Sequence, residues 1–160
     1  MARITPEQWA AQWANLGHKF QVNVHNFEVK AGKAAVEVFK ESFDRHRFNS
    51  QGSRAWPRWQ GKYSSRGSLL NEFGLLKESI KVKGIRSHTV TIHSDPNSYA
   101  RHRRHPGFCF AQVHNNLNTI NNKPLRGPKK ERQFIGHSTV LKRELEQLNI
   151  HIFDGFPINV

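Results

Sequence analysis

The stretch that decides the fold is Ser68–Ser94, SLLNEFGLLKESIKVKGIRSHTVTIHS. An apolar turn broken by Gly74 leads into two runs of alternating apolar and polar residues, separated by the short break 84–87. Alternation with a period of two on both sides of such a break predicts an antiparallel hairpin with one wet face. An isolated hairpin is marginal in water, so other elements must cover its apolar face. That face consists of Ile80, Val82, Val90 and Ile92.

The start of the chain predicts a short helix. Thr5 is a good N-cap, Pro6 fits the first helical position, and Gln8 completes a capping box. We expect Gly17 to end this helix, because glycine adopts the backbone conformation of a helix C-terminus at little cost. The apolar face of the helix consists of Trp9, Trp13 and Leu16.

A second, longer helix is predicted from Phe20 to about Arg47. Apolar residues recur there in steps of three and four, which is the helical period. The alternation over residues 20–24 also fits a strand, and Gly32 weakens a helix by about 1 kcal/mol relative to Ala. We expect this helix to be the main cover of the hairpin.

Two further elements complete the predicted fold. The run Phe108–His114 predicts a third strand that joins the hairpin sheet. Ser138 is expected to cap a last helix, which Gly155 and Pro157 end. The apolar tail after residue 155 either folds back or docks on a neighbour. The predicted fold class is α+β, with a small antiparallel sheet packed against a long N-terminal helix and a C-terminal helix, and with long basic loops.

Length and composition favour a single domain over residues 1–160. Its parts are a helical region at 1–47, a hairpin sheet with the C-terminal helix at 68–153, and a tail at 154–160. The hydrophobic fraction of 36% is low, but 11 Phe and 4 Trp bury much area per residue. One Cys excludes an internal disulfide and fits a reducing compartment. No run resembles a signal sequence or reaches membrane-spanning length, so we expect a soluble protein made in a cytoplasm.

The positive charge is concentrated in two segments. The chain has 25 Lys and Arg against 12 Asp and Glu, yet no acid lies between Asp44 and Glu72 or between Asp95 and Glu131. Ordinary surfaces mix the two signs, so we expect these segments to contact a partner, for which DNA phosphates and an acidic protein fit equally well. The candidates are Arg45, Arg47, Arg54, Trp56, Arg58, Trp59, Lys62, Arg66, Arg101, Arg103, Arg104, Lys123, Arg126, Lys129 and Lys130.

Trp56 and Trp59 lie in an irregular stretch, 48–67, that is rich in Gly, Ser and Arg. Trp56 followed by Pro57 either pins this loop onto the domain or anchors a partner. We favour the first interpretation, because isolated aromatic residues in loops usually pack locally.

Catalytic and metal-binding motifs are weak. A set of nitrogen and sulfur ligands matches no common zinc spacing, and the arginines between them would repel a cation. A His-Asn-Asn triplet at 114–116 is similar to the His-Asn-His nuclease motif but has no acidic ligand nearby. We therefore predict no catalytic residue, no metal, no cofactor and no enzymatic activity. The residues of this set are His102, His105, Cys109 and His114.

Several short motifs follow one another in a familiar order. They are F-x2-Q-G-x3-W-P at 48–57, L-L-x3-G-x-L-x2-S-I at 69–80, Val-His-Asn-Asn at 113–116 and R-Q-F-I-G-x-S at 132–138. This order resembles the phage virion-morphogenesis and tail-completion proteins, which are head–tail connector or tail terminator-like components of tailed bacteriophages. The basic insert Tyr99–Phe108 departs from the pattern of that family.

The resemblance implies a structural virion protein that completes the tail or joins it to the head. Such a protein would assemble as a ring, a hexamer in the family, at the neck/tail junction. Its implied partners are other copies of itself, neighbouring neck and tail-tube proteins and genomic DNA in the lumen, with no membrane. Its implied location is the virion, and the host cytoplasm during assembly. The alternative left open is a sequence-independent DNA-binding protein or nuclease accessory.

Overall fold

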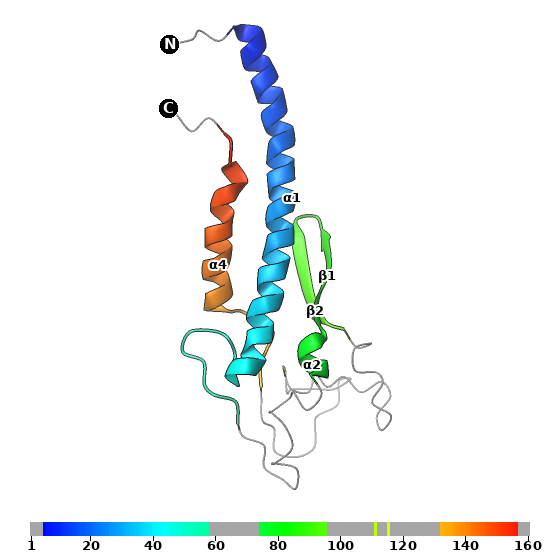
Figure 1. The fold of residues 1–160 in the computed structure, drawn as a ribbon, viewed down its shortest axis with the longest axis vertical. Helices are drawn as coiled ribbons and strands as arrows, with labels where there is room; N and C mark the ends of the chain where they lie inside the picture. The colour runs from blue at the N-terminus through cyan, green and yellow to red at the C-terminus, as the bar shows by residue number, and fades with distance from the viewer. Residues whose placement is uncertain (1–4, 58–73, 96–110, 112–114, 116–131, 157–160) are drawn as a thin grey trace.

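The computed structural model describes residues 5–57, 74–95, 111, 115 and 132–156. One long helix, α1 (Pro6–Arg45), forms the spine, with a hairpin on one side and the C-terminal helix on another (Figure 1). This arrangement confirms the predicted α+β class. The remaining elements are α2 (Leu75–Glu78), β1 (Ile80–Arg86), β2 (Thr89–Ser94), α4 (Thr139–Asn149) and the 3-10 helix η2 (Ile150–Phe153).

α1 is a single helix of 40 residues, so the predicted end at Gly17 and the alternative strand at 20–24 are both wrong. The capping box at its start is confirmed: the Gln8 amide donates to Thr5 Oγ1 over 3.3 Å, and the Thr5 amide donates to Gln8 Oε1 over 3.1 Å. A single glycine weakens a helix without ending it. Ala-rich turns before Gly17 and the absence of proline between Pro6 and Pro57 let the helix continue.

The predicted hairpin is confirmed, but its turn lies further along the chain. β1 and β2 are antiparallel and pair Val82 with Ile92 and Ile85 with Val90. The turn consists of Ser87 and His88, with φ of 46° and 59°, as a tight type I′ connection requires. The predicted break at 84–87 instead continues β1 as far as Arg86, and a bulge lies just before it, because the register shifts between Val82 and Gly84.

Gly32 lets the hairpin approach α1 closely. A Cβ atom at this position would lie 3.1 Å from Val82 Cγ2 and 3.2 Å from Val90 Cγ1. Both valines belong to the predicted apolar face, so α1 is confirmed as the cover of the hairpin. The glycine that weakens the helix locally is what allows the sheet to pack against it.

The hydrophobic core gathers around the C-terminal end of α1. The Phe43 ring lies 5.1 Å from the Phe134 ring and 5.5 Å from the Trp56 ring, between centroids, and both Phe side chains are almost fully buried. Ile80, where β1 begins, is completely buried in the same cluster. The remaining buried members are Ala35, Val38, Phe39, Phe48, Leu76 and Ala111.

α4 begins as predicted, with the Leu141 amide donating to Ser138 Oγ over 3.2 Å. The Ser138 hydroxyl also donates to the Asn49 carbonyl oxygen, which ties α4 to the loop after α1. The α-helix ends earlier than expected, at Asn149, and η2 continues it to Phe153 before Gly155 takes a φ of 79°. α4 and η2 run back along α1 (Figure 1).

The predicted strand at 108–114 is wrong at Ala111, the one position of that run that the structure describes, because Ala111 is helical and buried. Asn115 is helical as well, and its Oδ1 accepts from the Phe134 and Ile135 amides, each over 2.8 Å. Within the described residues the sheet has two strands.

Candidate functional site

The structure describes four of the predicted contact residues. Arg45, Arg47, Arg54 and Trp56 lie at or just after the C-terminal end of α1. The other predicted contact residues lie outside the described residues: Arg58, Trp59, Lys62, Arg66, Arg101, Arg103, Arg104, Lys123, Arg126, Lys129 and Lys130. The four candidate metal ligands, His102, His105, Cys109 and His114, lie outside the described residues as well.

The three arginines among these four residues, Arg45, Arg47 and Arg54, are exposed and lie close to one end of the molecule. Arg47 forms an isolated antiparallel bridge with Ala55, and Arg54 is the residue before Ala55. The backbone of Arg47 therefore lies close to that of Arg54. The Arg45 Nη2 atom lies 2.6 Å from Glu41 Oε1, so its charge is already paired within α1. Arg47 and Arg54 thus remain candidates for contact with a partner.

Trp56 is buried, so its predicted role of pinning the loop is confirmed and the alternative of a partner anchor is wrong. Its exposed fraction is 7%, and its Nε1 donates to the Gln133 carbonyl oxygen over 3.1 Å. Thr139 Oγ1 holds the same loop, because it accepts from the Gln51 amide over 2.8 Å. The loop 48–57 is therefore part of the folded body.

The described framework is close to neutral. It carries 14 Lys and Arg against 10 Asp and Glu, whereas the residues outside it carry 11 against 2. Several of its charges are paired across elements: Lys77 Nζ lies 2.7 Å from Asp44 Oδ1, and Lys40 Nζ lies 3.2 Å from Glu78 Oε2. Such exposed pairs add little to the free energy of unfolding, but each neutralises a positive charge of the framework locally.

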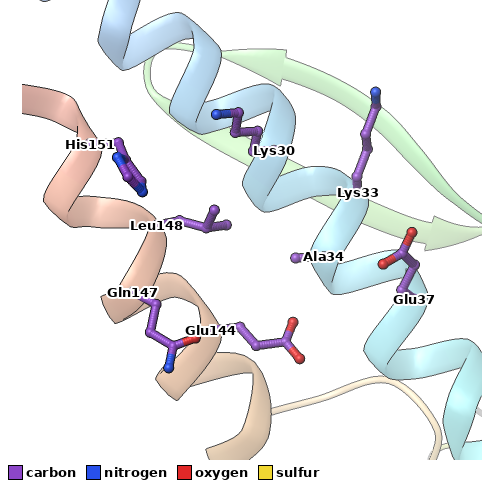
Figure 2. A pocket seen from close by; sticks show the side chains of 8 residues that line it. All are labelled: Lys30, Lys33, Ala34, Glu37, Glu144, Gln147, Leu148 and His151. Carbon is purple, nitrogen blue, oxygen red and sulfur yellow. The ribbon is translucent and has the colours of Figure 1, made fainter. Parts of the chain in front are cut away.

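A groove of about 340 Å³ separates α1 from α4 and η2 (Figure 2). Ala34 and Leu148 give it an apolar part, Lys30 and Lys33 lie toward one end, and Glu37 and Glu144 lie toward the other. Burial raises the pKa of the Glu144 carboxyl, and the charges of Glu37 and Glu41 raise it further. The groove is thus polarised along its length. The sequence could not show it, because it depends on how α4 lies against α1.

The described residues contain no group of three or more His, Cys, Asp or Glu side chains that could hold a metal ion. Among the described helices, none combines the length and the apolar character that crossing a membrane needs.

The N-terminal part of α1 has a bare aromatic surface. Trp9 and Trp13 are 58% and 55% exposed, and their rings meet edge to face with centroids 5.5 Å apart. No atom of the described residues would contact a Cβ at Gly17, one turn beyond Trp13. We call Trp9, Trp13 and Leu16 the N-terminal stripe.

The C-terminal segment covers the continuation of the same helix face. The Phe20 ring lies 5.9 Å from the Phe153 ring and 6.1 Å from the Phe156 ring, between centroids. Asn23 Nδ2 donates to the Ile152 carbonyl oxygen over 2.9 Å. Phe156, the first residue of the apolar tail, thus folds back onto α1. The sequence identified the stripe residues but not that they are left uncovered.

No protein-family model, no curated protein and no solved structure matches this chain. The sequence motifs and the geometry of the described residues therefore carry the functional argument.

Proposed function

We propose that this chain is a structural virion protein of a tailed bacteriophage that completes the tail or joins it to the head. It assembles as a ring, a hexamer on the pattern of the family it resembles, at the neck/tail junction. The proposal is supported by the order of the four short motifs and by the arrangement of the described framework, and it assigns no catalytic role.

The observation that carries the proposal is the exposed aromatic surface of the first turns of α1, at Trp9 and Trp13. Two tryptophans more than half exposed on one helix face are unusual for a protein that works alone, and tryptophan is enriched among the residues that dominate binding interfaces. A chain that leaves such a face bare is incomplete as a monomer. This is what a subunit of an assembly requires.

The distribution of charge gives the two parts of the molecule different roles in the proposed ring. The nearly neutral framework lets copies pack side by side without strong repulsion. The basic segments 45–66 and 101–130 then make the contacts with neighbouring neck and tail-tube proteins or with genomic DNA in the lumen. The exposed Arg47 and Arg54 lie where the first of these segments leaves the framework.

Analysis of purified particles tests this proposal. The protein should be present at a fixed copy number in complete virions, and the concentrated protein should form rings visible by negative-stain electron microscopy. Particles assembled without the gene for this chain should have separated heads and tails, or tails of incorrect length. Infectious particles that lack the protein would contradict the proposal.

A second candidate is a sequence-independent DNA-binding protein or nuclease accessory, which the excess of 11 basic over 2 acidic residues outside the framework favours. Binding through phosphates alone falls steeply as salt rises. This candidate predicts that the free protein binds any duplex as a monomer or dimer, and that its affinity falls by roughly 1,000-fold between about 50 and 200 mM salt if six or more phosphates are contacted. Weak binding with little salt dependence would exclude it.

A further inference from the structure

We propose that the N-terminal stripe, Trp9, Trp13 and Leu16, docks against the same stripe of a second copy of this chain. The inference rests on the self-assembly part of the proposed function and names one surface through which copies pair. Because the same patch meets itself, this contact joins two subunits, and the contacts that close a ring are separate from it. It does not depend on the particle in which the protein acts.

The spacing along α1 shows what kind of partner the stripe fits. Its residues alternate in steps of four and three, which places them on a single seam of a helix that packs against another helix. The C-terminal part of the seam is covered by a helical segment of the same chain, because Phe20 and Asn23 contact residues of η2 and the turn after it. The N-terminal part of the seam, which is the stripe, offers the same geometry to a helix of another molecule. The seam is Trp9, Trp13, Leu16, Phe20, Asn23 and Phe27.

The stripe carries little charge, as does the same stripe of a second copy, and it is flanked in the sequence by Arg3 and Lys19. Residues 5–18 contain no Lys or Arg and one carboxylate, Glu7. A strongly acidic partner such as DNA would gain nothing here, and an apolar, uncharged helix surface would fit. The corresponding surface of another copy has this chemistry.

Distance makes this end of the molecule the favourable meeting point for two basic chains. The loop after α1, α2, the end of β2 and the segment before α4 all lie toward the end of α1 opposite the stripe (Figure 1). The basic segments leave the framework there. A helix of 40 residues is about 60 Å long, while charges are screened over about 8 Å at physiological salt. Two copies that meet through their stripes with their α1 helices running in opposite directions thus keep the points where the basic segments leave the framework far apart.

The area available indicates weak affinity for the stripe alone. Because Trp9 and Trp13 are 58% and 55% exposed, the two indoles can bury roughly 170–280 Å² per copy, against about 800 Å² per partner in a standard stable interface. The stripe alone should therefore hold two copies only at high protein concentration, and further contacts would strengthen a complete assembly.

Sedimentation equilibrium of the full chain tests the inference with the variant W9A/W13A. The wild-type protein should associate at high protein concentration, and the double variant should weaken the association by about 30-fold or more, the effect of losing one interface hot spot. Circular dichroism should show unchanged helix content, because alanine is the best helix former and neither indole packs on the described core.

Two control variants test whether association depends on where the tryptophan side chains lie on α1, and not only on how many there are. Q12A/N15A changes two exposed polar residues of the same turns and should leave association unchanged. W9A/A11W keeps the number of tryptophans but moves one ring off the seam, and it should weaken association as much as W9A alone.

Three results would overturn the inference: a wild-type protein that stays monomeric, a W9A/W13A protein that associates as well as the wild type, or association that appears only after deletion of residues 157–160. The third result would show that the chain's own tail occupies the stripe. Rings in virions together with association that is insensitive to W9A/W13A would overturn this inference and leave the proposed function intact. Stripe-dependent association of a protein absent from virions would do the reverse.

Discussion

The two halves of α1 follow the same helical period and have opposite surroundings. In the C-terminal half, Val38, Phe39 and Phe43 are 3%, 4% and 1% exposed, because the hairpin, the loop 48–57 and Phe134 enclose them. In the N-terminal half, Trp9 and Trp13 are 58% and 55% exposed. Periodicity identifies the residues that share a helix face. It does not reveal whether the protomer itself covers that face.

The comparison also separates two sources of helix stability. The C-terminal half is held by packing, which supplies most of the stability of helices in proteins. Within the part of the chain that the structure describes, the turns of α1 that carry Trp9 and Trp13 have only their capping box, their Ala-rich sequence and their continuity with the packed part of the helix. The account therefore predicts large effects of substitution in the first region and small effects on protomer stability in the second.

The largest effect is expected from Phe43→Ala. Phe43 contacts both Trp56 and Phe134 in the centre of the core, so its removal leaves a cavity and should lower the free energy of unfolding by about 4 kcal/mol. Urea denaturation measures the change. Phe20→Ala is the matched control, because Phe20 is 38% exposed and should cost less than about 2 kcal/mol. Equal losses at the two positions would contradict the distinction between the halves.

The next effect is expected from Gly32→Leu. The added side chain would meet Val82 and Val90, whose methyl groups lie only 3.1 and 3.2 Å from the position of a Cβ. Overpacking of this kind should cost about 2 kcal/mol and loosen the hairpin. Denaturation gives the loss, and amide exchange in β1 and β2 shows where it falls. A gain in stability would mean that the hairpin does not pack on α1 at this point.

A smaller effect of opposite sign is expected from Gly17→Ala. The position lies inside the helix with nothing within 4 Å of a Cβ, so alanine should add about 1 kcal/mol to helix stability. Helix content by circular dichroism and the midpoint of thermal unfolding both report it. If α1 ended at Gly17, as the sequence predicts, the substitution would remove a C-terminal cap and lower stability instead.

The smallest effect is expected from Glu144→Gln in the groove between α1 and α4. Burial and the charges of Glu37 and Glu41 raise the pKa of Glu144, so the folded protein binds this proton more tightly than the unfolded chain does. Stability is therefore lost as the pH rises from the ordinary pKa of glutamate through the raised value. Removing the charge should raise stability at about pH 7 by no more than about 0.5 kcal/mol, and should have no effect near pH 3.

Glu146→Gln is the control for this pH effect, because Glu146 is exposed and its Oε1 atom lies 3.8 Å from Lys142 Nζ in an i,i+4 pair. That variant should leave stability unchanged or slightly reduced at neutral pH. A greater gain from Glu146→Gln than from Glu144→Gln would show that the general charge of α4, rather than the groove, controls stability.

The sequence predicts local features well where local chemistry decides them. The capping box at Thr5, the cap at Ser138 and the alternating strands of the hairpin are all present. The sequence wrongly predicts a helix end at Gly17, because a glycine has the same local preference inside a continuous helix as at its C-terminus. It predicts only a weakness at Gly32, because the role of this glycine depends on Val82 and Val90, which lie 50 or more residues away in the chain.

The candidate site was less predictable than the fold. The tryptophans of the stripe were identified as one helix face, but coverage of that face depends on where η2 and Phe156 end along α1. Trp56 shows the opposite case, since a loop residue that could have met a partner is held inside by Phe43 and Gln133. Tertiary contacts decided both outcomes.

Hydrogen exchange of α1 amides at low and high protein concentration tests the central claim most directly. The account predicts that amides of residues 9–18 exchange rapidly in dilute protein and become protected as copies associate, while those of residues 35–43 are strongly protected at both concentrations. Equal protection of the two regions in dilute protein, or protection of residues 9–18 that does not change with concentration, would contradict it.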